Sequence, residues 1–391
     1  MKFRYPSYYE KFQCVADCCE DTCCAGWEID IDDKSYEYYM SVEGEFGERL
    51  RANIKEYEPE SEDVYEQHGF VLQNNRRCPF LDEHNLCDIY RQLGEEALCD
   101  VCTDTPRNYL EYGGAREVSL SASCAEVGRL IYGDDRPISF VEKEIEGQLD
   151  FEENEDELLL AEQVRLARDN MIGILQNREM GILARIKAYL ACAEEVQHCL
   201  NTDSIIDIEK INWDVYLHNS TTVEPHTEKG AAYRLFLSRL RTFIGMDSIS
   251  EEWESMLQLL QERYVEPIDG ADCYAEEMAT YWARLESESR LYEYEHLLVY
   301  YSFLCLARSV DDYDFLAKAK MAVISFLMIR DIDCALFSKY QSYSKEDRIS
   351  TARVYAKEVE HSAENMEYLA DEILFEDMYT VENLCASLTI V

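Results

Sequence analysis

The sequence predicts a mainly α-helical protein: a loop-rich, cysteine-rich N-terminal metal-binding lobe followed by an all-α C-terminal domain. Three observations predict this. Ten of the sixteen cysteines lie between Cys14 and Cys124, turn formers crowd the first 136 positions, and apolar residues recur at helical spacing from about residue 155. With 391 residues the chain is longer than most single cores. We therefore expect a cysteine-rich domain over 1–136, a linker over 137–154 and a helical domain over 155–391.

Regular periodicity is weak in the N-terminal part. Helical spacing is visible in two short pieces, Asp33–Met40 and Ile89–Leu98. Turn formers such as Gly26, Pro79 and Gly113–Gly114 lie around them. This pattern indicates a compact lobe in which short helices are joined by loops.

From residue 155 onward, apolar residues alternate with charged ones at the 3.6-residue period of a helix. The predicted helices are Glu155–Leu175, Met180–Leu200, Ala231–Ile244, Glu251–Tyr264, Tyr274–Arg308, Tyr313–Ile329 and Lys345–Phe375. Glycine and proline between several of them mark helix ends. This half therefore predicts a helical bundle.

The chain is strongly acidic, with 80 acidic and 37 basic residues and a net charge of −43. Nucleic acids and anionic membranes bind proteins through Lys and Arg, so neither is an expected partner. The longest apolar stretches, Leu297–Ala307 and Met321–Ile329, are too short to span a bilayer. The N-terminal segment lacks the apolar region of a secretion signal, so we expect a cytoplasmic protein with reduced thiols.

The crowded early cysteines predict a metal centre, because closely spaced thiolates in a reducing compartment are typical metal ligands. Structural zinc commonly uses paired C-x₂-C motifs, and here Cys99-x₂-Cys102 alone has that spacing. Iron–sulfur clusters accept less regular spacing. Zinc and iron–sulfur both stay open, and reduced cysteines without metal are the third alternative.

Three segments resemble the flagellin lysine-N-methylase family, whose N-terminal part is similar to a cysteine-rich zinc- or iron-chelating domain. They read FQCVADCCEDTCCAGWEIDID, RRCPFLDEHNLCDIYRQLGEEALCDVCTDTPR and SLSASCAE. The metal ligands implied by the resemblance are Cys14, Cys19, Cys23, Cys24, Cys78, Cys87, Cys102 and Cys124. Cys18 and Cys99 lie outside that set, and Ala125 stands where the family pattern has proline.

The resemblance implies a methyltransferase that N-methylates lysine side chains of flagellin, its protein partner. The implied methyl donor is S-adenosylmethionine, and a 4Fe–4S cluster (or zinc) is implied in the cysteine-rich lobe. The sequence has no glycine-rich nucleotide-binding motif after a strand and no phosphate-binding loop, so a Rossmann-type donor site is not supported. The alternatives are a non-catalytic zinc- or iron-binding interaction module and an iron–sulfur redox protein.

Four residues are candidates for the chemistry beside the cysteines. EVEHSAEN near the C-terminus also resembles the family, and it supplies His361 and Glu360 as candidate catalytic groups, with Asn365 one helical turn beyond His361. Trp27 and Arg107 are candidate cofactor-binding residues, next to the cysteine motifs. The alternatives are core packing for Trp27, an ion pair for Arg107 and a solvated helix face for His361.

Overall fold

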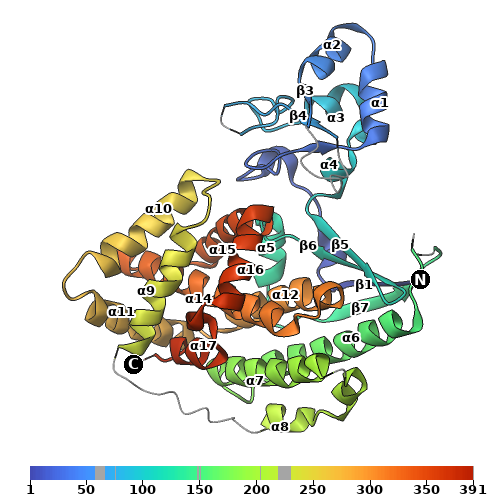
Figure 1. Ribbon diagram of the computed structural model, residues 1–391. Coiled ribbons are helices and arrows are strands. Elements are labelled where there is room, and N and C mark those ends of the chain that lie inside the picture. The colour runs from blue at the N-terminus through green and yellow to red at the C-terminus, as the bar shows by residue number, and fades with distance from the viewer. Residues whose placement is uncertain are drawn as a thin grey trace.

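The computed structural model describes residues 1–57, 67–74, 76–147, 149, 151–202, 204–218 and 230–390. Within these residues the protein is mainly α-helical, with seventeen α-helices, which confirms the predicted class. Figure 1 shows a small lobe that holds α1–α4 above a larger body of long helices. No helix in the described ranges is long and apolar enough to cross a membrane.

The small lobe combines short helices with a three-stranded antiparallel sheet of order β2–β4–β3. Its elements are β2 (Asp30–Ile31), α1 (Asp33–Ser41), α2 (Gly44–Ala52), β3 (Ile54–Glu56), β4 (His68–Phe70), α3 (Asp88–Leu93) and α4 (Asp100–Asp104). Helix α1 forms where it is predicted, and Asp32 caps it by accepting from Ser35 N at 2.8 Å. The predicted helix Ile89–Leu98 is shorter, because Gly94 ends α3 with a φ of 95°.

The body contains the longer helices. They are α5 (Ala125–Tyr132), α6 (Glu155–Gln176), α7 (Ile182–Asn201), α8 (Trp213–His218), α9 (Ala231–Ile244), α10 (Glu251–Leu260), α11 (Gly270–Ser287), α12 (Tyr292–Cys305), α13 (Ser309–Asp312), α14 (Phe315–Tyr340), α15 (Lys345–Glu360), α16 (Ala363–Phe375) and α17 (Val381–Ser387). Helices α6, α7, α9 and α10 start within two residues of the predicted positions.

Two of the predicted helices are wrong because each is broken near its middle. The stretch predicted as one helix over Tyr274–Arg308 forms α11 and α12, with Ser289 at a φ of 57° between them. The stretch over Lys345–Phe375 forms α15 and α16. His361 therefore caps α15, and it does not share a helix face with Asn365, which lies in α16.

A four-stranded sheet of order β5–β6–β1–β7 flanks the body (Figure 1). Its strands are β1 (Lys2–Pro6), β5 (Arg107–Tyr112), β6 (Ala115–Leu120) and β7 (Phe140–Glu144). None of these strands is predicted, and β7 lies inside the predicted linker. Gly113 and Gly114, at φ 57° and 66°, form the tight turn between β5 and β6. Buried Glu117 of β6 accepts two hydrogen bonds of 2.6 Å from Arg168 of α6, which ties the sheet to the body.

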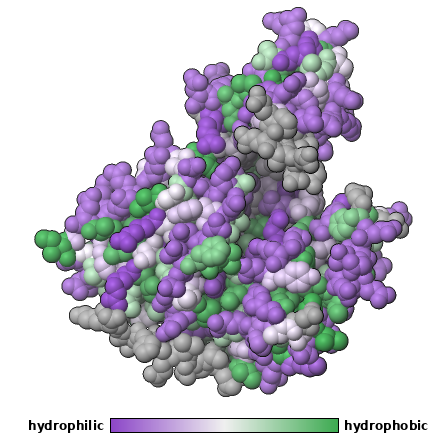
Figure 2. All heavy atoms as spheres, viewed as in Figure 1, coloured by the Kyte–Doolittle hydropathy of each residue, from purple (hydrophilic) through white to green (hydrophobic). Residues whose placement is uncertain are grey.

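The molecule has a main core in the body and a separate small core in the lobe. The small core draws its buried residues from Ile29 to Cys99. The main core includes Leu120, Ile131 and Ile138 as well as the long helices, so residues from the N-terminal third also pack into the body. The expected domain division at residue 136 stays a prediction. Figure 2 shows hydrophilic residues over much of the visible surface of both parts, in keeping with the net charge of −43.

Candidate functional site

Two distant parts of the chain meet where α15 ends. The helix ends at Glu360, His361 caps it, and Ser362 begins the turn into α16. This break brings the side chains of Glu360 and His361 to the segment after β6, where Ser121 and Ser123 are buried. Sequence separations of about 240 residues are thus closed by direct hydrogen bonds.

Glu360 is held by one of its two carboxylate oxygens. Tyr300 OH donates to Oε2 at 2.8 Å, and Ser121 Oγ donates to it at 3.1 Å. The other oxygen, Oε1, is buried and accepts no hydrogen bond of standard geometry among the described residues, but the buried hydroxyl of Tyr301, which also lacks such a bond, interacts with this carboxylate. Burial raises the pKa of Glu360 to about 7, although the hydrogen bonds from Tyr300, Tyr301 and Ser121 oppose the rise. This carboxylate can therefore take up a proton near neutral pH.

His361 is a neutral hydrogen-bonding group in this setting. Its Nε2 atom lies 2.9 Å from Ser123 Oγ and 3.0 Å from Ser121 Oγ. Burial, with the nearby positive charge of Lys357, lowers the pKa of His361 to about 4. The ring therefore positions the two serines and, through Ser121, the carboxylate of Glu360.

Trp27 connects the side chains around Glu360 and His361 to the cysteine-rich segment. Its ring stacks on His361, with centroids 4.6 Å apart and an angle of 19° between the planes. Lys357 Nζ lies 5.5 Å from the Trp27 ring centroid and forms an ion pair with Asp21. Arg353 of α15 also pairs with Asp21. Although burial works against it, Lys357 and then Arg353 lower the pKa of Asp21, so this carboxylate is charged and anchors the segment between Cys19 and Cys23 to α15.

Arg107 is not brought into this cluster. It begins β5, and its guanidinium lies 5.5 Å from the ring centroid of Phe12. It also lowers the pKa of Asp104, which burial and Asp100 raise overall. Its described contacts do not include Trp27, Glu360 or His361. The prediction of a cofactor-binding role for Arg107 stays open, at a different place from that of Trp27.

The predicted metal ligands provide suitable donors, but they are not drawn together tightly. Among the described residues, no three His, Cys, Asp or Glu side chains converge as ligands of a single ion. All ten early cysteines are free thiols, and the Sγ atoms of Cys99 and Cys102 lie 3.4 Å apart. The donor type therefore fits a thiolate-bound metal or cluster. Cys99, which the resemblance leaves out, is in direct contact with the implied ligand Cys102.

Three residues of the cluster are not predicted from the sequence. Ser121 and Ser123 lie in SLSASCAE, but the predicted functional residue of that motif is Cys124. Tyr300 is one of 28 tyrosines, and it lies in a helix that is buried on nearly all sides. The signal that could have found the serines is their spacing of two, which places both hydroxyls beside one cysteine.

Other residues of EVEHSAEN have a structural role. Glu358 accepts hydrogen bonds from Ile249 N at 2.7 Å and from Ser250 Oγ at 2.6 Å. Asn365 accepts from Asp247 N at 2.9 Å. Both residues hold the α9–α10 loop, and Ile249 of that loop lies close to Gly26, one residue before Trp27.

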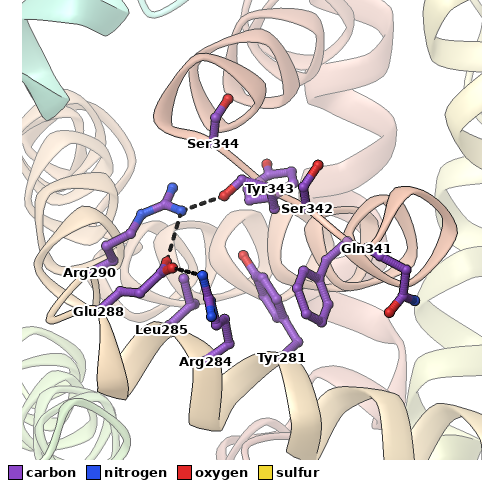
Figure 3. A pocket seen from close by; sticks show the side chains of 10 residues that line it. Tyr281, Arg284, Leu285, Glu288, Arg290, Gln341, Ser342, Tyr343 and Ser344 are labelled. Carbon is purple, nitrogen blue, oxygen red and sulfur yellow. Dashed lines mark hydrogen bonds and ion pairs between the residues drawn. The ribbon is translucent and has the colours of Figure 1, made fainter.

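A cavity of about 330 Å³ lies at the other end of α15. Figure 3 shows its lining, which comes from the ends of α11 and α14, the turn before α12 and the segment that leads into α15. Arg284 and Arg290 both approach Glu288, and Arg290 also donates to the carbonyl of Tyr343. Ser344, the N-cap of α15, forms part of the rim.

Comparison with known proteins supports the resemblance. The family model described as the FliB lysine N-methylase C-terminal domain matches residues 168–387, more than half of the chain. Lysine-N-methylases of Salmonella typhimurium and Salmonella choleraesuis are each 28% identical over 153 residues, which is 36% of this chain and 35% of theirs. The flagellar biosynthetic protein FliU of Salmonella muenchen is 30% identical over 151 residues, or 35% of this chain and 81% of that protein.

These matches cover the chain unevenly. The aligned part spans about a third of the length of the two lysine-N-methylases. The family model includes Tyr300, Glu360 and His361, whereas Ser121 and the early cysteines precede it. No solved structure matches this chain significantly.

Proposed function

The chain belongs to the FliB lysine N-methylase family, and from that premise we propose that it methylates lysine side chains of flagellin with S-adenosylmethionine as the methyl donor. One observation carries the proposal for the site. The carboxylate of Glu360 is buried among the hydroxyl groups of Tyr300, Tyr301 and Ser121 and has a pKa of about 7. A lysine side chain that is to be methylated must bind, lose a proton and then attack.

Glu360 suits the first two of these tasks. Free lysine has a pKa of about 10.4, so it reaches the protein as an ammonium ion. That ion can donate a hydrogen bond to Oε1 of Glu360. Because the carboxylate has a pKa of about 7 in the folded protein, it is a stronger base than an exposed carboxylate and can take the proton. The neutral amine then attacks the methyl carbon of the sulfonium, the carbon–sulfur bond breaks, and S-adenosylhomocysteine leaves as a neutral thioether.

The neighbouring residues fix this carboxylate. Tyr300 and Ser121 donate to Oε2, so a substrate amine would approach Oε1, where it would replace the interaction of the Tyr301 hydroxyl with the carboxylate. His361 orders Ser121 and Ser123, and Trp27 stacks on His361 from the cysteine-rich segment. The positive charge of Lys357 would oppose an incoming ammonium, but its ion pair with Asp21 offsets that charge.

The proposed cofactors fit the donors near this site. S-adenosylmethionine supplies a methyl group on a cationic sulfonium, for which the indole of Trp27 and the carboxylate of Glu360 are suitable neighbours. A 4Fe–4S cluster, when bound by the thiols, can supply an iron position for the amino and carboxylate groups of the donor. Cys124 follows Ser123 directly, and Cys23 lies near Trp27 in sequence. These thiols would therefore place an iron–sulfur cluster beside the side chains that surround Glu360.

The experiment is methyl transfer by the anaerobically purified full chain. The protein is incubated with S-adenosylmethionine labelled in the methyl group and with flagellin, and labelled lysine is identified by mass spectrometry. We expect mono- or multiply methylated flagellin lysines. If metal-replete protein transfers no label to flagellin, a non-catalytic metal-binding module or an iron–sulfur redox protein is the better assignment.

A further inference from the structure

The four-stranded sheet has two edges, and they differ in how they are protected. At one edge lies β7, where Glu142, Lys143 and Glu144 place three exposed charged side chains in a row. Charged side chains on an edge strand prevent other chains from pairing with it. At the other edge lies β5, whose middle residues are uncharged. The β5 edge is therefore the more open of the two to an added strand.

The turn between β5 and β6 determines which main-chain groups of β5 point away from the sheet. Because the loop has two residues, its flanking pair, Tyr112 and Ala115, exchange hydrogen bonds with each other. Such pairs alternate along an antiparallel ladder with pairs that make no hydrogen bond to each other. The N–H and C=O groups of Arg107, Tyr109 and Glu111 therefore point away from β6, toward the open edge.

These outward main-chain groups lack partners. None of the N–H and C=O groups of Arg107, Tyr109 and Glu111 has a hydrogen-bond partner among the described residues. Residues two apart in a strand are about 7 Å from each other, so the three donor–acceptor pairs have the spacing of another extended chain. Figure 1 shows the β5–β6 hairpin leading from the body toward α4 of the lobe. The β5 edge thus presents a template for a peptide that binds as an additional strand.

The two faces of an added strand would meet different surroundings. On the body side, Leu110 packs against a small apolar cluster that contains Tyr112 and Ala307. Phe303 lies beside Leu110 on this side as well. On the opposite face, the side chain of Tyr109 is 39% exposed. Because side chains alternate between the two faces of a strand, a segment with apolar residues at every second position would fit this edge best.

One end of the β5 edge lies at the Glu360 site. Arg107, the first residue of β5, is opposite Leu120, the last residue of β6. The next residue, Ser121, continues the pairing by donating its N–H to Pro106 O at 2.7 Å, and its Oγ donates to Glu360 at 3.1 Å. Neighbouring strands are about 4.8 Å apart, so an added strand would lie about 10 Å from β6. The edge therefore leads an extended chain to the end of the sheet at which Glu360 is held.

We propose that the β5 edge binds an extended segment of the protein substrate as a fifth strand of the sheet, and that this pairing presents the lysine to Glu360. The net charge of −43 favours a lysine-bearing segment, because the field of the chain attracts cationic partners. The inference rests on the proposed function and adds how the substrate is held. Since the main chain makes the hydrogen bonds, binding depends on an extended conformation more than on a fixed sequence.

Hydrogen exchange of the full chain tests the edge directly. In the free protein the outward N–H groups of Arg107, Tyr109 and Glu111 exchange freely. Added flagellin should slow their exchange, measured by mass spectrometry, and leave β7 unchanged. Unchanged exchange of β5 at saturating flagellin would overturn the inference. Protection of β5 that grows with the concentration of the chain alone would also overturn it, because a second copy would then occupy the edge.

Methyl-transfer kinetics separate binding from chemistry. Tyr109→Pro removes the central outward N–H and keeps the hydrogen bonds of β5 to β6, because proline is tolerated where the N–H faces away from the sheet. It should raise KM for flagellin by at least about tenfold and change kcat by less than about twofold, since the pairing is equal in ground and transition states. An unchanged KM in a Tyr109→Pro chain that melts like the wild type contradicts the inference.

Two variants are matched controls. Tyr109→Ala keeps the N–H and should change KM far less than Tyr109→Pro. Glu142→Pro makes the same change on β7, where the N–H of Glu142 also points away from the sheet, and should keep the wild-type KM. The two proposals can fail separately. Flagellin that protects β5 but receives no label contradicts the proposed function, whereas methylated flagellin without protection of β5 contradicts this inference alone.

Discussion

The main core and the small core achieve stability in different ways. In the body, every residue of α14 from Met321 to Ala335 is buried, so one long helix packs on all sides. In the lobe, two of the eleven buried core residues are cysteines, and three more cysteines pack against them. The body therefore has a large core of apolar side chains, whereas cysteines make up a large share of the small core in the lobe.

Between these two regions lies the cluster around Glu360. Its acid–base groups come from the body, and its aromatic cover, Trp27, comes from the cysteine-rich segment. The acid–base groups and the cysteines thus lie in separate parts of the molecule, which touch at a few residues such as Trp27 and His361. Four predictions can break or sharpen this comparison.

The largest effect is expected for Glu360→Gln. Loss of a general base lowers rates by roughly 10²–10⁴-fold, so methyl transfer to flagellin should fall by at least about 100-fold. The metal content should not change, because the residue lies on the body side. Label transfer and metal analysis measure both. Glu367→Gln, at an exposed position of α16, is the matched control and should keep full activity. A loss of activity below tenfold would remove Glu360 from the proposed chemistry.

The second prediction compares one truncation in each core. Phe80 in the small core and Phe326 in α14 are both fully buried, and Phe→Ala in a core costs about 3–5 kcal/mol. F326A should lower the melting temperature of the body. F80A should open the lobe alone, so that hydrogen exchange rises over residues 29–57 and 76–102 while α14 stays protected. Equal loss of protection in both regions would show one cooperative unit.

The third prediction concerns the sheet, which flanks the body. Arg168→Met leaves the Glu117 carboxylate buried without its bidentate partner, and breaking such a pair costs about 3–5 kcal/mol. The melting temperature of the body should fall, and the rate of amide hydrogen exchange in the lobe should not change. The double variant R168M/E117Q removes the stranded charge and should recover part of the loss, as thermal unfolding would show. A double variant as unstable as R168M would mean that packing of Arg168, and not charge, is lost.

The smallest effect is a pH dependence of stability. The pKa of Glu360 is higher in the folded protein, at about 7, than its ordinary value of 4.5. The folded state therefore binds more protons across that window, and the contribution of Glu360 to stability falls as pH rises from about 4.5 to 7, by at most roughly 3 kcal/mol. E360Q should thus gain stability over the wild type at pH 8 and show little difference at pH 4.

His361 provides the contrast for this measurement. Its folded pKa of about 4 lies below the ordinary 6.5, so its contribution to stability grows as pH rises through that range. Chemical denaturation across pH 4–8 measures the difference in unfolding free energy between each variant and the wild type. This difference should fall with rising pH for H361Q, whereas it should rise for E360Q. Slopes of the same sign in both variants would contradict the charge states assigned to the pair.

Much of the body could be predicted, because helical periodicity is a local signal. Helix α9 has the predicted bounds Ala231–Ile244. The breaks at Ser289 and at His361–Ser362 lack glycine and proline, so no residue type marks them. The sheet was missed for another reason: β1 pairs with β6 and β7, more than 100 residues away, and strand pairing at that distance leaves no local pattern.

The candidate site also combines residues that the sequence predicts with residues that it does not. Glu360, His361 and Trp27 were singled out by motif and by place in the sequence, and the structure brings them together. Ser121 and Tyr300 reach Glu360 from separate elements, and no sequence rule connects those elements to α15. Contacts of this kind follow from tertiary packing, which pattern and composition do not encode.

Helix α15 sets a limit on what the cavity in Figure 3 can do. Sixteen residues at a rise of 1.5 Å make the helix about 24 Å long, with the cavity rim at Ser344 and the carboxylate of Glu360 at opposite ends. A small molecule in the cavity therefore cannot contact the Glu360 carboxylate, or a lysine side chain that we propose to bind there. A shift or rotation of α15 as a rigid helix is one way in which a molecule in the cavity could change the position of Glu360.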